Sequence, residues 1–440
     1  MRRVPSNDRV GRPVKPLRIG LFGRLASGNI GNDASMEAVL AYLREKHPTA
    51  TVDAMCNGPE RMWSHYGIPA TKLFHETVFA RRPSRPVRAA FLLAEKLVDA
   101  VTIAAWVRRH DAVIIPGMGV LEATLPIDPW GLPYSMYLLS VFGKLFRTKV
   151  ALVSVGASSI KQASTRWLYV QSAKLAYYVS FRDAWSRLVM AQQGLDTSRS
   201  PIYPDLAFAI PLPPYEPGDA RAIGIGVMDY SGSNDDRRPS LEIQAAYVQS
   251  VKLFARWLVD NDYKVRIFFG DNDDEVIARE VLADLAEYSP NMAPETVALE
   301  PVATFDDVTQ VVQSVSMVVA TRFHSVMAAV RLAKPTLSLG YAGKSAVIMS
   351  DAGLADFCLA AGSLDAAQII EHFKELERKP PELRIEMQEN TAEKARLLDE
   401  QFELLSEKLF QPTKSESIVV KPDRVNTEQD NDEQPAILGR

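Results

Sequence analysis

Cysteine is scarce in this sequence, because Cys56 and Cys358 are the only two among 440 residues and they lie far apart. That scarcity excludes a disulfide framework and a cysteine-rich metal site, and it fits a reducing compartment. The first 17 residues are basic and contain proline, but they lack the apolar stretch of a cleaved secretory signal. The sequence therefore predicts a cytoplasmic protein that begins with a flexible arm over residues 1–16.

The chain also lacks a clear excess of either charge, since 50 basic residues face 54 acidic ones and the formal net charge is −4. This balance gives no global positive field, so we expect no nucleic-acid partner and look for ligands at local clusters. The chain is, however, long and rich in apolar residues. A chain of 440 residues, 47% of them hydrophobic, can bury two separate cores.

Short apolar runs alternate with helical patterns along most of the chain, which predicts βαβ units and parallel sheets. A cluster of prolines between Pro211 and Pro217 interrupts the alternation, and the series restarts after it. We therefore expect an α/β fold with two Rossmann-like domains, 17–215 and 216–410, that face each other across a cleft. The expected strands are Leu17–Gly23, Thr51–Cys56, Ala112–Ile115, Val150–Gly156 and Tyr178–Phe181, then Ala222–Met228, Lys264–Gly270, Met317–Thr321 and Thr336–Gly340.

Two segments fall outside this alternation. Residues 411–440 are polar and charged and contain no aromatic side chain, a composition that predicts a disordered tail. The segment 81–107 begins with four arginines in eight residues and continues as a mainly apolar window broken by Glu95, Lys96 and Asp99. Those charges argue against a membrane-spanning helix. A packed helix beside a solvated basic loop explains the pattern, and the alternative is peripheral contact with the inner face of the cell membrane.

The most informative motif is Thr321-Arg322-Phe323-His324, which follows an expected strand and opens an expected helix. It combines a permanent cation, a titratable imidazole and a helix N-terminus, and all three favour an anion. Lys344 follows the next expected strand and places a third nitrogen base in the same domain. The convergence of these bases predicts a site for an anionic substrate.

Expected strand ends elsewhere carry further candidates. Gly28-Asn29-Ile30-Gly31-Asn32-Asp33 has glycines that let the backbone approach a ligand and N–H groups that can hold phosphate or carboxylate. As a plain loop it would instead use Asn32 or Asp33 to cap the helix. The turn Pro116-Gly117-Met118-Gly119 either lines the cleft or is only a tight turn without a role in ligand binding. Arg182 presents a planar fork for a carboxylate or phosphate, unless a salt bridge occupies it.

The acidic run Asp271-Asn272-Asp273-Asp274 clusters carboxylates of the kind that bind Mg²⁺. Acidic residues are also expected in the first turn of a helix, where they interact favourably with the helix dipole. We adopt the second interpretation and predict no metal site.

Taken together, these motifs resemble the polysaccharide pyruvyl transferase family over residues 17–360. The C-terminal signature of that family is similar to Thr321 to Leu354, with Arg322, His324, Pro335, Tyr341 and Lys344 in register. Its earlier motifs are similar, in the same order, to Gly28–Asp33, Pro116–Leu121, Ser180–Ser186 and Pro204-Asp205. Three positions depart from the family pattern: Asn32 stands where an acid is common, Phe323 replaces leucine and Pro116 replaces glycine. Asp33 is the carboxylate that remains in the first loop.

The resemblance implies a fold similar to the GT-B glycosyltransferases and the transfer of pyruvate from phosphoenolpyruvate onto two hydroxyls of a sugar. The product would be a pyruvate ketal on a polysaccharide or on its lipid-linked precursor. Phosphoenolpyruvate would be a co-substrate in the second domain, the first domain would take the acceptor, and no cofactor is expected. His324 would be the general acid or the partner of the leaving phosphate, with Arg322 beside it. The implied substrate-binding residues are Gly28, Asn29, Asp33, Gly119, Arg182, Tyr341 and Lys344.

Two other functions stay open. A GT-B glycosyltransferase would share the architecture and use Arg322 and Lys344 on the diphosphate of a nucleotide sugar. A non-catalytic scaffold of a polysaccharide assembly complex would fit the altered Asn32 and the long tail. A dehydrogenase is disfavoured, because no Gly-x-Gly-x-x-Gly motif follows the first expected strand.

Overall fold

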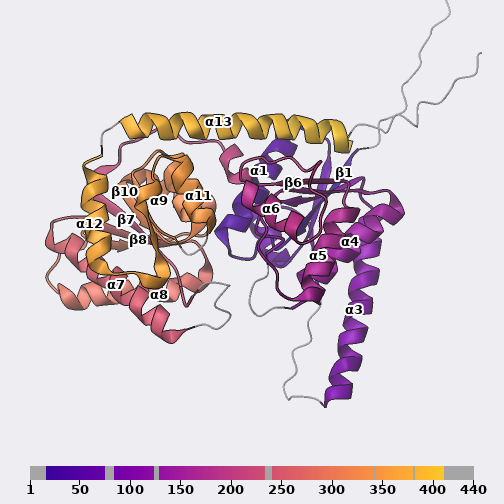
Figure 1. Cartoon of the computed structure of the whole chain (residues 1–440), viewed down its shortest axis with the longest axis horizontal. Coiled ribbons are helices and arrows are strands. Elements are labelled where there is room, and N and C mark those ends of the chain that lie inside the picture. The colour runs from indigo at the N-terminus through magenta and orange to yellow at the C-terminus, as the bar shows by residue number, and fades with distance from the viewer. Residues whose placement is uncertain are drawn as a thin grey trace, which may run out of the picture.

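The computed structural model describes residues 16–74, 84–122, 128–232, 240–340, 343–379 and 382–410. Its strands form two six-stranded sheets, with the orders β3-β2-β1-β4-β5-β6 and β12-β11-β10-β7-β8-β9. Each sheet is parallel and is covered by helices, so that the chain forms two lobes (Figure 1). In both sheets the strand order reverses beside the first strand of the set, which is the topology of a doubly wound Rossmann-like unit. The α/β fold class with two Rossmann-like units is confirmed.

The first sheet is built from short apolar strands, and the helices between them begin at recognisable caps. The Asn29 side chain caps α1 by accepting from Asn32 N–H, and Asp183 caps α6 in the same way. Asn29, rather than Asn32 or Asp33, is therefore the cap of the first helix. The elements are β1 (Arg18–Gly23), α1 (Ile30–Lys46), β2 (Thr51–Cys56), α2 (Pro59–Tyr66), β3 (Ala70–Lys72), α3 (Arg85–Val107), β4 (Ala112–Pro116), α4 (Leu132–Phe146), β5 (Lys149–Val155), α5 (Ala163–Leu175), β6 (Tyr178–Phe181) and α6 (Ala184–Gln192).

The second sheet repeats this plan after a linker that contains the short helix η1 (Leu206–Ala209). Its elements are β7 (Asp219–Val227), α7 (Leu241–Asp260), β8 (Lys264–Phe269), α8 (Glu275–Tyr288), β9 (Val297–Leu299), α9 (Phe305–Ser314), β10 (Val315–Ala320), α10 (Phe323–Arg331), β11 (Thr336–Gly340), α11 (Gly343–Asp351), β12 (Cys358–Ala360) and α12 (Ala366–Glu377). The edge strands β3, β9 and β12 were not expected from the sequence. Each has three residues, which is too short for an alternation of apolar and polar side chains to be visible.

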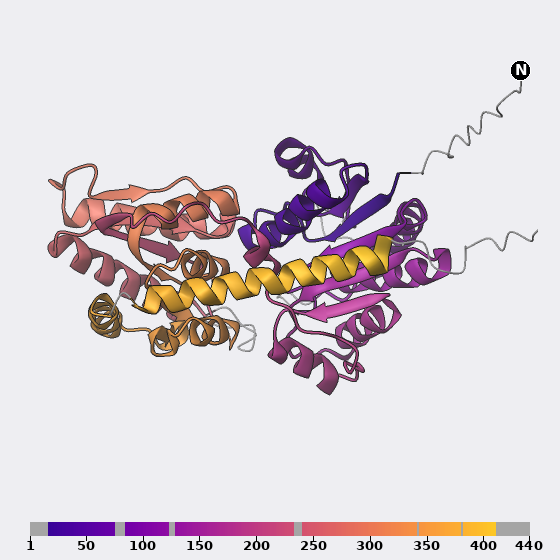
Figure 2. The ribbon, with the colours of Figure 1, turned by 90° about the horizontal axis from the view of Figure 1, so that it is seen from above.

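The final long helix, α13 (Glu382–Leu405), runs across both lobes and ends on the first one (Figure 2). Its residue Gln401 is buried there, where its amide accepts from Ser154 Oγ at 2.9 Å and donates to Ser180 Oγ at 2.7 Å. Phe402 stacks on Tyr42 of α1 with ring centroids 4.4 Å apart. The range 216–410 expected for the second domain thus includes a segment that packs on the first sheet.

The linker is fixed to the second lobe by one buried lysine. Lys334 donates from Nζ to the carbonyl oxygens of Glu216, Pro217, Gln313 and Val315, at 2.8 to 3.1 Å. Burial lowers the pKa of this ammonium group to about 8. Four backbone carbonyls, together with the nearby charge of Glu216, therefore compensate for the desolvation of its charge.

Candidate active site

A cavity of about 280 Å³ lies between the carboxyl ends of the strands of the two sheets, where open α/β sheets bind their ligands. Residues after β1, β4 and β6 line it from the first lobe, and residues after β7, β8, β10 and β11 line it from the second. The lining residues are Arg24, Asn29, Asn32, Met118, Gly119, Val120, Glu122, Leu132, Tyr169 and Arg182, and then Met228, Gly270, Arg322, Phe323, His324 and Lys344.

Six of the nine residues predicted to form the site line this one cavity: Asn29, Gly119, Arg182, Arg322, His324 and Lys344. Tyr341 lies outside the described residues. Arg24, Asn32 and Glu122 also line the cavity but were not predicted as ligands. The signal that could have identified Arg24 is its position directly after β1, at the carboxyl edge of the first sheet, where Arg182 also lies after β6.

Cations dominate the lining of the cavity. Arg24, Arg182, Arg322 and Lys344 contribute four positive charges, and Glu122 contributes the only negative charge among the lining residues. Burial acts to raise the pKa of Glu122, but Lys344 and Arg182 beside this carboxyl lower it below its ordinary value. Glu122 is therefore ionised, and the lining keeps a positive balance suited to an anionic ligand.

Arg182 is held by acidic side chains on several sides. Its guanidinium lies 2.8 Å from Glu122 Oε1, 3.3 Å from Asp205 Oδ2 and 3.7 Å from Asp183 Oδ2, and its side chain is only 3% exposed. A buried cation needs such partners to offset its desolvation. The salt-bridge interpretation of Arg182 is thus correct, and this residue orders the cavity wall while it also faces the cavity.

Arg322 is fixed by a bidentate ion pair with the fully buried Asp274, in which Nε and Nη2 each donate at 2.7 Å. Burial raises the pKa of the Asp274 carboxyl, and the Arg322 guanidinium opposes that shift. Asp271, from the same acidic run, accepts from Asn29 Nδ2 at 2.7 Å and so joins the two lobes. These side chains are engaged with protein partners, and the described ranges bring together no cluster of His, Cys, Asp or Glu able to hold a metal ion.

His324 is a neutral base in this site. Burial lowers the pKa of its imidazole to about 4, and the nearby cations Arg182 and Lys344 add to the shift that Asp205 opposes. Its Nε2 atom lies 3.9 Å from Asp205 Oδ2 and has no hydrogen-bond partner among the described residues. The titratable imidazole predicted from the sequence is therefore uncharged at neutral pH in the protein without a bound anion.

The imidazole of His324 rests directly on the backbone of α1 across the cleft. A methyl group at Gly31 would lie 1.8 Å from His324 Nδ1, which is closer than any real contact. Glycine is required here for close approach between the lobes. The same turn is tied to the second lobe by Ile30 N–H, which donates to Gly270 C=O at 3.2 Å.

We expect Gly31→Ala to lower turnover by about 10²-fold, because the added methyl displaces the imidazole by an ångström or more. The unfolding midpoint should change far less than the turnover. The measurement is steady-state kinetics beside thermal unfolding, with Gly362→Ala as the control. A methyl at Gly362 would meet only the Tyr230 hydroxyl, at 3.3 Å. Equal activity of the two variants would contradict the close contact.

Two residues of the first loop do not line the cavity as predicted. Asp33 points into the first lobe, where its Oδ1 accepts from Ala26 N–H at 2.7 Å and burial raises its pKa to about 7. Its neighbour Asn32 lines the cavity instead. Gly28 has φ +91° and lies against Asn272, so it shapes the contact between the lobes. The Asp33 carboxylate, which was expected to face the ligand, therefore does not line the cavity.

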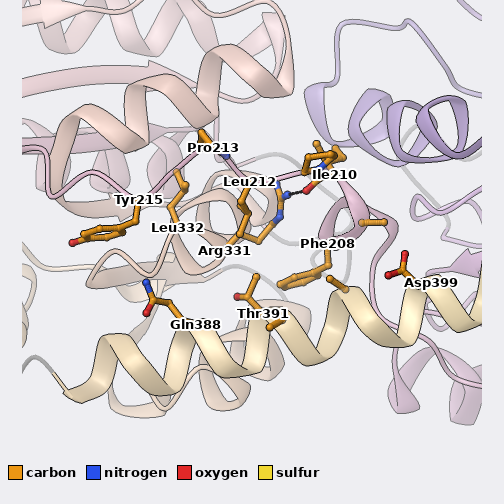
Figure 3. Close-up of a pocket in the computed structure, with 14 residues that line it drawn as sticks. Phe208, Ile210, Leu212, Pro213, Tyr215, Arg331, Leu332, Gln388, Thr391 and Asp399 are labelled. Carbon is orange, nitrogen blue, oxygen red and sulfur yellow. Dashed lines mark hydrogen bonds between the residues drawn. The ribbon is translucent and has the colours of Figure 1, made fainter. Parts of the chain in front are cut away.

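A second cavity, of about 300 Å³, lies under α13 beside the linker (Figure 3). Phe208, Ile210 and Leu212 give it a largely apolar lining, and its cation is the buried Arg331 (Figure 3). The Arg331 guanidinium donates to the Ile210 carbonyl. This cavity lies away from the strand ends and lacks the cluster of cations, so it is not the candidate active site.

Solved structures with similar folds include a UDP-GlcNAc 2-epimerase, MurG and a glycosyltransferase. UDP-GlcNAc 2-epimerase from Neisseria meningitidis, bound to UDP-GlcNAc, is 13% identical with a TM-score of 0.54, over 89% of this chain and 99% of that one. MurG from Acinetobacter baumannii is 13% identical with a TM-score of 0.51, over 89% and 100%. A glycosyltransferase from Rickettsia africae is 12% identical with a TM-score of 0.54, over 91% and 100%. These likenesses show the GT-B fold.

Comparison with curated protein sequences gave no match. The family model for polysaccharide pyruvyl transferase matches residues 29–343, which is most of the chain and includes the loop at Asn29, the Arg182 turn and the Arg322-Phe323-His324 turn. With the matched segment carrying every one of those cavity-lining motifs, this chain belongs to the polysaccharide pyruvyl transferase family.

Proposed function

We propose that this transferase moves pyruvate from phosphoenolpyruvate onto two hydroxyls of one sugar and forms a pyruvate ketal. The observation that carries the proposal is the cavity in which four cations surround a neutral imidazole. Phosphoenolpyruvate is a small, highly charged anion with a carboxylate and a phosphate. Arg322, Lys344 and Arg24 would offset these charges with directed donors, and guanidinium groups suit the planar geometry of carboxylate and phosphate.

The reaction needs one proton at the methylene carbon of phosphoenolpyruvate. Protonation gives a methyl group and leaves an oxocarbenium-like centre at the adjacent carbon, where the first sugar hydroxyl forms a C–O bond and loses its proton. The bond to phosphate then breaks, the phosphate departs with its electron pair, and the second hydroxyl closes the ring. Two hydroxyl protons are thus released, one replacing the proton spent on the methylene carbon and one leaving with phosphate.

His324 is suited to carry that proton once the anion is bound. In the unliganded protein its imidazole is uncharged at pH 7, because its pKa is about 4. A phosphoenolpyruvate anion beside it favours the charged form and raises this pKa. Binding of the ligand therefore protonates His324, which can then act as the general acid. Asp205, 3.9 Å from Nε2, would stabilise the imidazolium on the opposite side.

The acceptor is a sugar of a polysaccharide or of its lipid-linked precursor, bound on the side of the first lobe near Gly119 and Asn32. No cofactor is needed for the proposed steps, since they involve only proton transfer and substitution at carbon. The alternative is a transfer that uses a nucleotide sugar, because the enzymes of similar fold include one bound to UDP-GlcNAc.

Thermal unfolding with phosphoenolpyruvate, with UDP-GlcNAc and with neither distinguishes the two functions. A ligand at 100 times its dissociation constant adds about 2.7 kcal/mol to the free energy of unfolding. We expect phosphoenolpyruvate alone to raise the midpoint. Stabilisation by UDP-GlcNAc alone would overturn the proposal and favour a nucleotide-sugar transferase.

A further inference from the structure

Helix α3 turns an apolar face to solvent. Leu93, Leu97 and Val101 are 64%, 60% and 70% exposed, which is unusual for large apolar side chains that lie on one side of a helix. Val87, Phe91, Leu92 and Val98 of the same helix are also exposed. The N-terminal part of α3 projects away from the first lobe and leaves this face uncovered (Figure 1).

Two charged residues of α3, Lys96 and Asp99, lie on the opposite, buried side of the helix. Lys96 and Asp99 form an ion pair of 2.6 Å with side chains only 10% and 0% exposed, and Lys96 also donates to the Trp130 carbonyl at 3.0 Å. Trp106 and Ile103 are buried on this inner side as well. The usual arrangement of a surface helix is thus reversed, because the charged pair faces the protein and the apolar side chains face solvent.

The exposed stripe extends from Val87 to Val101, about 21 Å along the helix axis at 1.5 Å per residue. Leaving this much apolar area in water is unfavourable, so a partner that covers it is expected. Among the described residues no helix is long and apolar enough to cross a membrane.

The charge next to the stripe selects the kind of partner. Arg85 and Arg88 are the basic residues in the first turn of α3, and the sequence before the helix adds Arg81 and Arg82, with no acidic residue from 81 to 88. We infer that α3 docks on the surface of an anionic lipid bilayer, with its apolar stripe at the headgroup boundary and the positive charge of its first turns attracted to the headgroups. This inference does not depend on the proposed function, although it would bring the cleft close to a lipid-linked acceptor.

The test is co-sedimentation of the full-length protein with vesicles of phosphatidylcholine alone and of equal parts phosphatidylcholine and phosphatidylglycerol. We expect binding to the anionic vesicles that weakens as salt is raised. Leu93→Gln/Leu97→Gln/Val101→Gln should weaken binding by about ten-fold or more, because the apolar contact is lost. Arg85→Gln/Arg88→Gln should weaken it by roughly ten-fold, since each basic residue contributes several-fold at an anionic surface.

The matched control is Leu241→Gln/Val276→Gln, which changes side chains that are 80% and 70% exposed in the second lobe and should leave vesicle binding unchanged. Equal binding of the wild type and the Leu93→Gln/Leu97→Gln/Val101→Gln variant would overturn the inference. So would a wild-type dimer that this variant converts to a monomer without any vesicle binding, because α3 would then be a contact between two copies. Equal binding to neutral and anionic vesicles would overturn the part assigned to the arginines.

Discussion

His324→Ala is expected to lower the turnover of pyruvyl transfer by about 10²–10⁴-fold, the usual contribution of a positioned acid or base. The residue has the contacts for this role, because it lies in the cation-lined cavity, touches Gly31 across the cleft and faces Asp205. The measurement is the release of phosphate from phosphoenolpyruvate in the presence of acceptor. His65→Ala is the matched control, since His65 is an exposed residue of α2.

The same variant tests whether binding of phosphoenolpyruvate protonates His324. Because the pKa of His324 is about 4 without ligand and should rise when an anion binds, binding takes up a proton and the affinity for phosphoenolpyruvate should increase as pH falls from 8 toward 6. Calorimetry in buffers of different ionisation enthalpy measures this uptake. The part due to His324 disappears in His324→Ala. A variant that keeps most of its activity and the full proton uptake would remove His324 from the mechanism.

The pKa of His324 also has a consequence for stability. The unfolded chain binds a proton at His324 near pH 6.5 and the folded protein only near pH 4, so acidification through this range favours unfolding. The corresponding loss of stability should be smaller in His324→Ala. Comparing unfolding midpoints of the two proteins at pH 7 and pH 5 separates this effect from catalysis.

Arg322→Ala should abolish the stabilisation by phosphoenolpyruvate, and it should also weaken the protein without ligand. Removal of Arg322 leaves Asp274 as a buried carboxylate without its bidentate partner. Loss of one member of a buried ion pair costs about 3–5 kcal/mol. The single variant therefore combines two effects, and its failure to bind would be uninformative by itself.

The double variant Arg322→Ala/Asp274→Asn separates the two effects. Asparagine removes the buried charge and keeps an oxygen that can accept from Asp229 N–H, as Asp274 Oδ1 does at 2.8 Å. We expect the double variant to regain most of the lost stability and to remain unresponsive to phosphoenolpyruvate in thermal unfolding. Asp274→Asn with Arg322 intact is the matched control. Recovery of the ligand response in the double variant would show that Arg322 serves only to neutralise Asp274.

The sequence was sufficient to predict the architecture and six residues that line one cavity, because both depend on strand ends. Buried parallel strands such as β4 are uninterrupted apolar runs, and the residues directly after each run lie at the same edge of the sheet. That logic placed Arg182 at the carboxyl edge of the first sheet and Arg322 and His324 at that of the second, and both edges line one cavity. It could not decide between neighbours on a helix, because Asn32 and Asp33 differ by only about 100° around α1. It also could not foresee which carboxylate would pair with which cation, as in Arg322 with Asp274, because that choice is made by packing between distant segments.

The crossing of α13 to the first lobe has a consequence for how the protein is made. The hydroxyls of Ser154 and Ser180, and the ring face of Tyr42, belong to segments that leave the ribosome early, but their partners Gln401 and Phe402 are synthesised near the end of the chain. The first lobe can therefore assemble its sheet during translation, yet it keeps an uncovered polar and aromatic patch until α13 has been synthesised. A nascent chain stalled before residue 401 would expose this patch to chaperones and proteases. Docking of α13 thus completes the first lobe only after the second sheet has been synthesised.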